Sequence, residues 1–258
     1  MLSDFSVIVK QFDSAIKVVC ISDVHFGALE HMKDEWERFV KSVEADPAMF
    51  LIMNGDLINN NTRSSVGSPW DDAIRPREQK RLMVEMLDPI KDRILCCTSG
   101  NHERRSMKDA DDDPTYDIMT KLDIEDVYRQ NAAFLKILLG KRGDQANVCY
   151  RFAVTHGAGG GIYTGATVNR NERWGNVIDG VDCVVVGHTH KGTVTRPSKI
   201  VFDPHNNKVS MKDYVVISSV SWQRYAEYPL QKMLLPSSTG NPQILHLSDK
   251  EKKIEVRW

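Results

Sequence analysis

The sequence predicts an α/β protein in which β-sheets pack against one another and helices lie outside them. In the first two thirds of the chain, short apolar runs that are typical of strands alternate with stretches of helical periodicity. In the last third, strand-like runs follow one another with little helical pattern between them. Alternating strands and helices followed by successive strands favour a layered protein with sheets at its centre.

The composition is that of a folded globular protein. The chain has 258 residues, 41% of them hydrophobic, and its 34 Lys and Arg against 35 Asp and Glu give a net charge of −1. This balance excludes intrinsically disordered and collagen-like chains and disfavours a surface coated with basic patches. The chain shows no apolar run of the roughly 18 residues that a membrane span requires and no signal-peptide pattern, so we expect no membrane association. The five cysteines include no CxxC pair, so we expect buried free thiols and a cytoplasmic location.

The first half of the chain predicts three buried strands, two amphipathic helices and the start of a third helix. The strands are expected at 16–22, 49–53 and 94–98, and the helices at 33–45 and 76–87. Residues 54–74 are polar and predict a long loop. Asp113 followed by Pro114 is typical of a helix start, with the aspartate as cap and the proline in the first turn.

The second half predicts mostly strands. A hairpin is expected from 134–139 and 148–154, joined by a turn with Gly140 and Gly143. A glycine-rich loop over 157–165 precedes a helix expected at 169–178. The remaining strands are expected at 183–186, 199–202, 214–220, 243–247 and 254–258, with a turn at 205–207.

Five of the predicted strands end in side chains that can bind metals. These side chains are Asp23, His25, Asp56, Asn101, His156, His188 and His190. In α/β sheets ligands bind at the carboxyl ends of strands, and residues two apart on an extended chain point to the same side. Each motif alone also has an ordinary explanation, such as a turn, a helix cap at Asn101 or a hydrogen-bonded core histidine at His156. The occurrence of all five together favours a metal centre.

The ligand types narrow the choice of metal. Imidazole, carboxylate and amide groups without a thiolate suit Mn²⁺, Fe, Zn²⁺ or Ni²⁺ rather than Ca²⁺ or a structural zinc site built from cysteines.

The order of the motifs resembles that of the calcineurin-like metallophosphoesterase superfamily. The sequence reads Asp-x-His, Gly-Asp, Gly-Asn-His-Glu, His-Gly and Gly-His-x-His between Asp23 and His190. The resemblance implies a four-layer αββα sandwich, with two mixed β-sheets flanked by helices. It implies a single domain over 1–258, with rim insertions near 57–76 and 104–130.

The resemblance also implies a centre of two divalent metal ions, with Mn²⁺ expected first and Fe, Zn or Ni as alternatives. Asp56 would bridge the two ions, and His102 would be the general acid, oriented by Glu103. The reaction implied is hydrolysis of a phosphate ester by a hydroxide that bridges the metals. The first ion would be held by Asp23, His25, Asp56 and His190, and the second by Asp56, Asn101, His156 and His188.

The segments around the motifs favour the phosphodiesterase and DNA-repair-nuclease branch of the superfamily. Phosphoprotein phosphatases typically follow Gly-Asp with Val-Asp-Arg-Gly and place an arginine before Gly-Asn-His. Here Asp56 is followed by Leu-Ile-Asn-Asn-Asn, and Ser99 precedes Gly100. Nucleic-acid ends are therefore among the candidate substrates. A phosphomonoesterase or protein phosphatase, and a metal-binding scaffold without catalysis, remain the alternatives.

Substrate contacts are expected from arginines near the motifs. Arg63, Arg104 and Arg105 could bind phosphate oxygens, although they could equally belong to a solvated segment of mixed charge. Trp70 and Tyr163 could stack on a base. The sequence gives no signal for a defined protein partner.

Overall fold

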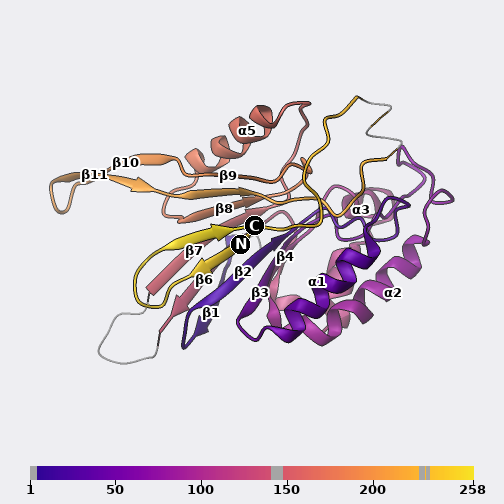
Figure 1. Cartoon of the computed structure of the whole chain (residues 1–258), viewed down its shortest axis with the longest axis horizontal. Coiled ribbons are helices and arrows are strands. Elements are labelled where there is room, and N and C mark those ends of the chain that lie inside the picture. The colour runs from indigo at the N-terminus through magenta and orange to yellow at the C-terminus, as the bar shows by residue number, and fades with distance from the viewer. Residues whose placement is uncertain (1–4, 141–147, 227–229, 231–232) are drawn as a thin grey trace.

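The computed structural model shows two six-stranded sheets packed face to face, with helices on both outer surfaces (Figure 1). The structure describes residues 5–140, 148–226, 230 and 233–258. The predicted four-layer αββα arrangement is confirmed.

The first sheet is built from the N-terminal strand–helix units and completed by the C-terminus. Its strand order is β14-β13-β2-β3-β4-β5, in which β2 to β5 run parallel and β13 pairs antiparallel with β2. The strands are β2 (Ile16–Ile21), β3 (Met49–Asn54), β4 (Ile94–Thr98), β5 (Tyr128–Arg129), β13 (Ile244–Leu247) and β14 (Ile254–Arg257).

The second sheet has the order β1-β6-β7-β8-β12-β9. The predicted hairpin forms its middle, because β6 and β7 pair antiparallel, while β7, β8 and β12 run parallel. Gly143 of the predicted turn lies outside the described residues. The strands are β1 (Val7–Phe12), β6 (Ala132–Leu139), β7 (Val148–Thr155), β8 (Cys183–Val186), β9 (Thr193–Thr195) and β12 (Val215–Ser218).

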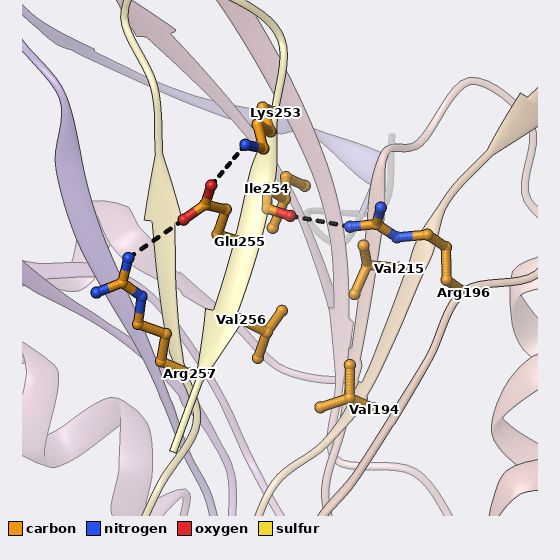
Figure 2. Close-up of a pocket in the computed structure, with 8 residues that line it drawn as sticks. All are labelled: Val194, Arg196, Val215, Lys253, Ile254, Glu255, Val256 and Arg257. Atoms are coloured by element: carbon orange, nitrogen blue, oxygen red, sulfur yellow. Dashed lines mark hydrogen bonds and ion pairs between the residues drawn. The ribbon is translucent and has the colours of Figure 1, made fainter.

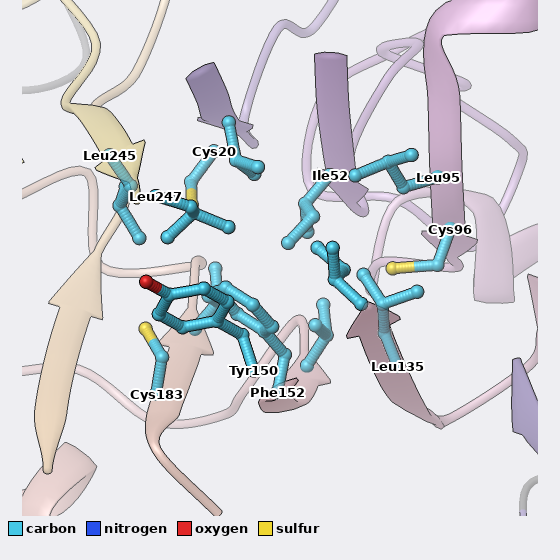
Figure 3. Close-up of a cluster of buried hydrophobic side chains, with 14 of the residues drawn as sticks. Cys20, Ile52, Leu95, Cys96, Leu135, Tyr150, Phe152, Cys183, Leu245 and Leu247 are labelled. Atoms are coloured by element: carbon cyan, nitrogen blue, oxygen red, sulfur yellow. The ribbon is translucent and has the colours of Figure 1, made fainter. Parts of the chain in front are cut away.

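Alternating side chains of the central strands explain the layers. In β2, Val18 and Cys20 enter the core between the sheets, and Val19 and Ile21 pack under the helices on the other face. Figure 3 shows the core between the sheets, where Tyr150 and Phe152 of β7 meet apolar side chains of the first sheet. Strands that are buried on both faces read as continuous apolar runs, which is why the sequence identified them.

The helices cover the two outer faces. The first sheet is covered by α1 (Lys33–Ala45), α2 (Pro76–Leu87) and α4 (Pro114–Lys121), and the second by α5 (Thr164–Val177). As predicted, the Asp113 side chain caps α4 by accepting the Tyr116 N–H. The structure also describes α3 (Glu103–Ala110) and the 3₁₀ helices Asp88–Arg93 and Glu125–Val127. Among the described helices, none combines the length and apolar character that a membrane crossing requires.

Several expected boundaries need correction. Helix α5 begins at Thr164 rather than near residue 169, so Gly165 lies in the helix and not in the loop. The 214–220 strand is shorter, since β12 covers only Val215–Ser218. A two-stranded hairpin of β10 (Ser198–Asp203) and β11 (Lys208–Asp213) projects from the body of the molecule (Figure 1). Its second strand is rich in charge, which is why periodicity did not reveal it.

Candidate metal centre and active-site groove

The predicted metal ligands lie together at one edge of the sandwich. Asp23 and His25 follow β2, Asp56 follows β3, and Asn101 follows β4, so these four come from the first sheet. His156 follows β7, while His188 and His190 follow β8, so the second sheet supplies three histidines. The carboxyl ends of parallel strands from both sheets thus bring the predicted ligand side chains together.

Asp23, His25 and His190 form one group whose ligand atoms converge. The Nε2 atom of His190 lies 3.2 Å from Oδ1 of Asp23 and 3.1 Å from Nε2 of His25. Oδ1 of Asp23 is buried and takes part in no hydrogen bond, and Nδ1 of His25 is also without one. Two imidazole nitrogens and a carboxylate oxygen that face one another are the donor set of a divalent metal site.

Asp56, His156 and His188 form the second group, together with Asn101. Oδ1 of Asn101 lies 2.9 Å from Nε2 of His156 and 2.6 Å from Nδ1 of His188. Oδ2 of Asp56 lies 3.2 Å from Nε2 of His156 and 3.7 Å from Nε2 of His25. Asp56 therefore faces both groups, which is the place expected for a carboxylate that bridges two ions.

The backbone turns sharply at most of these ligands. Five of them have φ angles between 47° and 69°, in the left-handed region: Asp23, His25, Asp56, His188 and His190. Asp, Asn and His enter this region more readily than other residues that carry a side chain, and strain of this kind gathers at functional sites. Gly100 is required beside them, because a Cβ atom there would lie 2.0 Å from Oδ1 of Asp56.

The charges of the site favour a cation. Burial raises the pKa of the Asp23 carboxyl, but His190 and His25 outweigh it and hold that pKa well below its usual range. Burial lowers the pKa of His156, yet Asp56 and Asp23 raise it to about 9. Nδ1 of His156 lies 2.9 Å from the Asn54 carbonyl, which leaves Nε2 directed at the site. Two buried carboxylates beside these imidazoles concentrate negative charge at a point where a divalent metal ion would bind, with the histidines as neutral ligands.

His102 lies beside the two groups, at the start of α3. Its Nδ1 is 2.7 Å from the backbone carbonyl of Asn59, so Nδ1 carries a proton and donates it. Its Nε2 accepts a hydrogen bond from Arg105 at 3.0 Å and lies 4.0 Å from Oδ2 of Asp56. Burial lowers the pKa of His102 to about 3, although Asp56 opposes the shift. The imidazole is neutral, and Nε2 is the nitrogen directed at the site.

Glu103 does not have the role that the resemblance implied. Its buried carboxylate accepts three backbone N–H groups, from Asp56 at 3.0 Å, Ile58 at 3.1 Å and Gly100 at 2.9 Å. The His102 imidazole is oriented by the Asn59 carbonyl instead. Burial and the nearby Asp56 raise the pKa of Glu103 to about 7. Glu103 thus holds the turns after β3 and β4, because a carboxylate at the start of α3 reaches back to their amides.

A groove of about 620 Å³ lies over the candidate metal ligands. His25, His102, His188 and His190 line it together with polar and apolar walls. The polar wall includes Asn59, Asn61, Asp72 and Arg105, and the apolar wall includes Leu29, Tyr225 and Leu235. Most of these wall residues were missed by the sequence reasoning, because single polar or apolar residues in loops carry no periodic signal.

Some of the residues predicted to contact substrate line the groove, and others lie outside it. Of the three arginines, only Arg105 lines the groove, while Arg63 is exposed and Arg104 lies outside the lining. The glycine loop contributes Gly159, Gly160 and Gly161 to the lining. Trp70 is exposed and stacks on Arg75, with the guanidinium carbon 3.9 Å from the ring centre. Tyr163 is exposed beside the start of α5.

A second pocket, of about 470 Å³, opens between β14 and the β9 and β12 strands of the other sheet (Figure 2). Val194, Val215 and Val256 form its apolar surface. Its charged groups already have partners, since Glu255 pairs with Lys253 and Arg257, and Arg196 donates to the Ile254 carbonyl. It contains none of the predicted ligands, so the groove over the histidines is the candidate active site.

Comparison with known proteins agrees with this geometry. A sequence profile for calcineurin-like phosphoesterases matches residues 16–192. No curated protein matches the chain.

Similar solved structures include the following three, each at low identity. A conserved uncharacterized protein and predicted phosphoesterase from Streptococcus pneumoniae TIGR4 is 11% identical, with 95% of this chain and 100% of that one covered and a TM-score of 0.35. A metallophosphoesterase from Sphaerobacter thermophilus is 15% identical, with 90% and 84% covered and a TM-score of 0.41. A point mutant of a cold-active protein tyrosine phosphatase is 13% identical, with 96% and 79% covered and a TM-score of 0.34.

Proposed function

The chain belongs to the calcineurin-like phosphoesterase family, and from this premise we propose that it is a phosphodiesterase that uses two Mn²⁺ ions. The family makes it a metal-dependent phosphoric ester hydrolase. The observation that carries the proposal is the convergence of seven ligand-type side chains into two groups that Asp56 joins. We also propose a cytoplasmic location, because all five cysteines are free.

The proposed ligand sets follow the two groups of side chains. Asp23, His25 and His190 would hold one ion, and Asn101, His156 and His188 would hold the other, with Asp56 shared between them. When bound, two divalent ions lower the pKa of a coordinated water and neutralise charge on the phosphoryl oxygens.

His102 and Arg105 would act on the ester itself. Nε2 of His102 faces the groove and accepts from Arg105 in the present state, while the Asn59 carbonyl holds the Nδ1–H. Once Arg105 turns to the phosphate, Nε2 would take up a proton from water and pass that proton to the departing oxygen. The guanidinium of Arg105, now on Nε2 of His102, would bind a non-bridging oxygen of the phosphate. His102 is the last residue of the Gly-Asn-His motif and Arg105 lies three residues further on, in the first turn of α3, so both stand close to Asn101 in the chain.

The charge of the groove favours a diester over a monoester. Among the described lining residues, Lys191 donates to the Gly161 carbonyl at 2.7 Å, and Arg224 lies 3.8 Å from Glu35. Arg105 is therefore the cation placed against the candidate general acid. One guanidinium suits the single negative charge of a diester better than the double charge of a monoester.

The walls of the groove favour a small organic diester over a long nucleic-acid strand. Leu29, Tyr225 and Leu235 offer apolar surface to an ester group. The lining also includes the carboxylates Glu30, Asp71 and Asp72, which would repel a chain of phosphates. Nucleic-acid ends remain the second candidate within the diester class, because an end brings only one or two phosphates to the site.

The test compares two aryl esters in metal-free protein to which Mn²⁺ is returned. We expect hydrolysis of bis-p-nitrophenyl phosphate that depends on Mn²⁺ and exceeds hydrolysis of p-nitrophenyl phosphate by about tenfold or more in kcat/KM. A preference for the monoester would make the protein a phosphomonoesterase. Failure to turn over either ester, with two metal ions bound, would support a non-catalytic scaffold. Short oligonucleotides with free ends, assayed beside the aryl diester, separate the two kinds of diester.

A further inference from the structure

The carboxylate of Asp72 accepts hydrogen bonds from three side-chain amides at the groove. Its Oδ1 accepts from Nδ2 of Asn59 and from Nδ2 of Asn61, each at 2.7 Å. Its Oδ2 accepts from Nε2 of Gln79 at 2.9 Å. All three donors are neutral, and burial raises the pKa of the Asp72 carboxyl. Desolvation of a carboxylate whose side-chain partners are all neutral amides costs free energy of folding. This cost indicates that Asp72 has a function besides holding the loop in place.

The two asparagines that Asp72 binds are in turn hydrogen-bonded to His102 and Arg105, the side chains proposed to act on the ester. The backbone carbonyl of Asn59 accepts from Nδ1 of His102 at 2.7 Å. Oδ1 of Asn61 accepts from Nη1 of Arg105 at 2.9 Å. Because a carboxylate only accepts hydrogen bonds, Asp72 obliges Asn61 to turn its NH₂ group toward Asp72 and its oxygen toward Arg105. One carboxylate oxygen of Asp72 is thereby connected to both His102 and Arg105, through Asn59 and Asn61 respectively.

Asp72 is itself anchored, although it lies in an irregular loop. Gln79 is fully buried on α2, and its Oε1 accepts the Asn60 N–H at 2.8 Å while its Nε2 also donates to the Ile74 carbonyl at 2.6 Å. Gly27 packs so closely on this side chain that a Cβ there would lie 2.5 Å from it. The loop between β3 and α2 is thus fixed to α2, through Gln79, at the position of Asp72.

We propose that Asp72 is a positioning residue that sets the orientation of both His102 and Arg105 through Asn59 and Asn61. The inference rests on the proposed phosphodiesterase function. It adds a specific consequence, because loss of Asp72 should weaken proton transfer to the departing oxygen and binding of the phosphate at the same time.

The kinetic test uses Asp72→Ala, Asp72→Asn and a matched control, Asp109→Ala. Asp109 also bonds the loop between β3 and α2, through Oγ of Ser64 at 2.7 Å, but among the described contacts its carboxylate makes no hydrogen bond with the side chain of His102 or Arg105. Two diesters serve as substrates: bis-p-nitrophenyl phosphate, which has a good leaving group, and diphenyl phosphate, which has a poor one. Help from His102 matters more for the poor leaving group.

We expect Asp72→Ala to lower kcat about tenfold on bis-p-nitrophenyl phosphate and about a hundredfold on diphenyl phosphate, and to raise KM for both. Asp72→Asn should recover most of this loss, because its oxygen can still accept from Asn59 and Asn61. Asp109→Ala should behave as wild type. An equal loss on both diesters, or equal effects of Asp72→Ala and Asp109→Ala, would overturn the proposal.

A spectroscopic readout keeps the inference independent of turnover. In metal-free protein labelled with ¹⁵N-histidine, the His102 signals, assigned with His102→Ala, should show a proton on Nδ1 in wild type and in Asp72→Asn. Asp72→Ala should shift them toward a mixture of tautomers. If wild type hydrolyses neither diester, the proposed function fails, and this measurement still decides whether Asp72 positions His102. Unchanged His102 signals in Asp72→Ala would overturn that part.

Discussion

Glu103 accepts the backbone N–H of Asp56 at 3.0 Å, although the two residues follow different strands of the sheet. The same carboxylate oxygen accepts the Gly100 N–H at 2.9 Å. A single buried side chain therefore holds together the turns after β3 and β4. Asp56 is the carboxylate that faces both groups of ligand-type side chains, and its position depends on Glu103, which is not among the residues that line the groove.

Glu103→Gln should destabilise the metal-free protein by about 1–3 kcal/mol. The amide NH₂ would have to face one of three backbone N–H groups, and donors cannot pair with donors. Affinity for Mn²⁺ should also fall about tenfold or more, as is typical when a supporting partner of a ligand is lost. Urea unfolding and metal titration measure the two effects. The exposed Glu125→Gln serves as control, and equal stability of the two variants would contradict the prediction.

Asp56→Asn should remove metal and activity together. The amide keeps the size of the side chain but loses the negative charge that faces both groups of ligands. We expect fewer than two ions per chain by elemental analysis and no measurable hydrolysis of the diester. A fully metallated and active variant would exclude Asp56 as the shared ligand.

His102→Ala should separate metal binding from catalysis. The ligands of both groups remain, so metal content should stay near the wild-type value. Turnover should fall by about 10²–10⁴-fold, because Nε2 of His102 is the group placed to protonate the departing oxygen. Steady-state kinetics on diphenyl phosphate check the loss, and unchanged turnover would mean that another group or water supplies the proton.

Arg105→Ala and Arg63→Ala should differ in KM. Arg105 lines the groove beside His102, whereas Arg63 is exposed on the rim loop. Loss of the groove guanidinium should raise KM for the diester about tenfold, in line with one charge-assisted hydrogen bond. Arg63→Ala should leave KM unchanged. Equal values of KM in the two variants would remove Arg105 from the substrate contacts.

Asp182→Asn should lower stability in a way that depends on pH. Asp182 meets Arg151 at 3.0 Å, Lys252 at 2.9 Å and Lys212 at 3.5 Å. Burial raises the pKa of its carboxyl, but these cations outweigh burial and lower it overall. A pKa that is lowered in the folded state contributes stability above the unfolded value of about 4, and this contribution is lost as the pH falls through the lowered pKa.

The variant should therefore be less stable than wild type by about 1–2 kcal/mol at pH 7, since the partner cations are partly screened by solvent. The difference should shrink below about pH 4, where the carboxylate of the unfolded wild-type chain takes up a proton, and should vanish as the pH falls through the lower pKa of the folded state. Urea unfolding at a series of pH values tests this, and a difference that is constant with pH would contradict it.

The strands and helices that carry the site were predictable because burial imposes a pattern. Helices 33–45 and 76–87 were predicted with their observed boundaries, since each has one apolar face and a clear end. Strands β2, β3 and β4 are buried on both faces and read as apolar runs. Exposed elements such as β11 and the short β9 escaped, because pairing rather than burial stabilises them.

The sequence could indicate which side chains would gather at the candidate site, but it could not indicate the residues that support them. The seven ligand-type side chains stand at the ends of predicted strands, and the structure brings all of them together. The role of Glu103 depends on which backbone amides face it, and the role of Asp72 depends on a loop whose path leaves no pattern in the sequence. Contacts between distant loops arise from the tertiary fold, and a local pattern cannot indicate them.

The left-handed turns at the ligands limit how this centre can change in evolution. A new side chain at Asp23, His25, Asp56, His188 or His190 must first tolerate the backbone. Exchange among Asp, Asn and His meets this condition, whereas β-branched residues and most others would add about 1–2 kcal/mol of strain at each position. A change of preferred metal would thus proceed by swaps between oxygen and nitrogen ligands. A lineage that moved toward thiolate ligands would need compensating changes in the turns first.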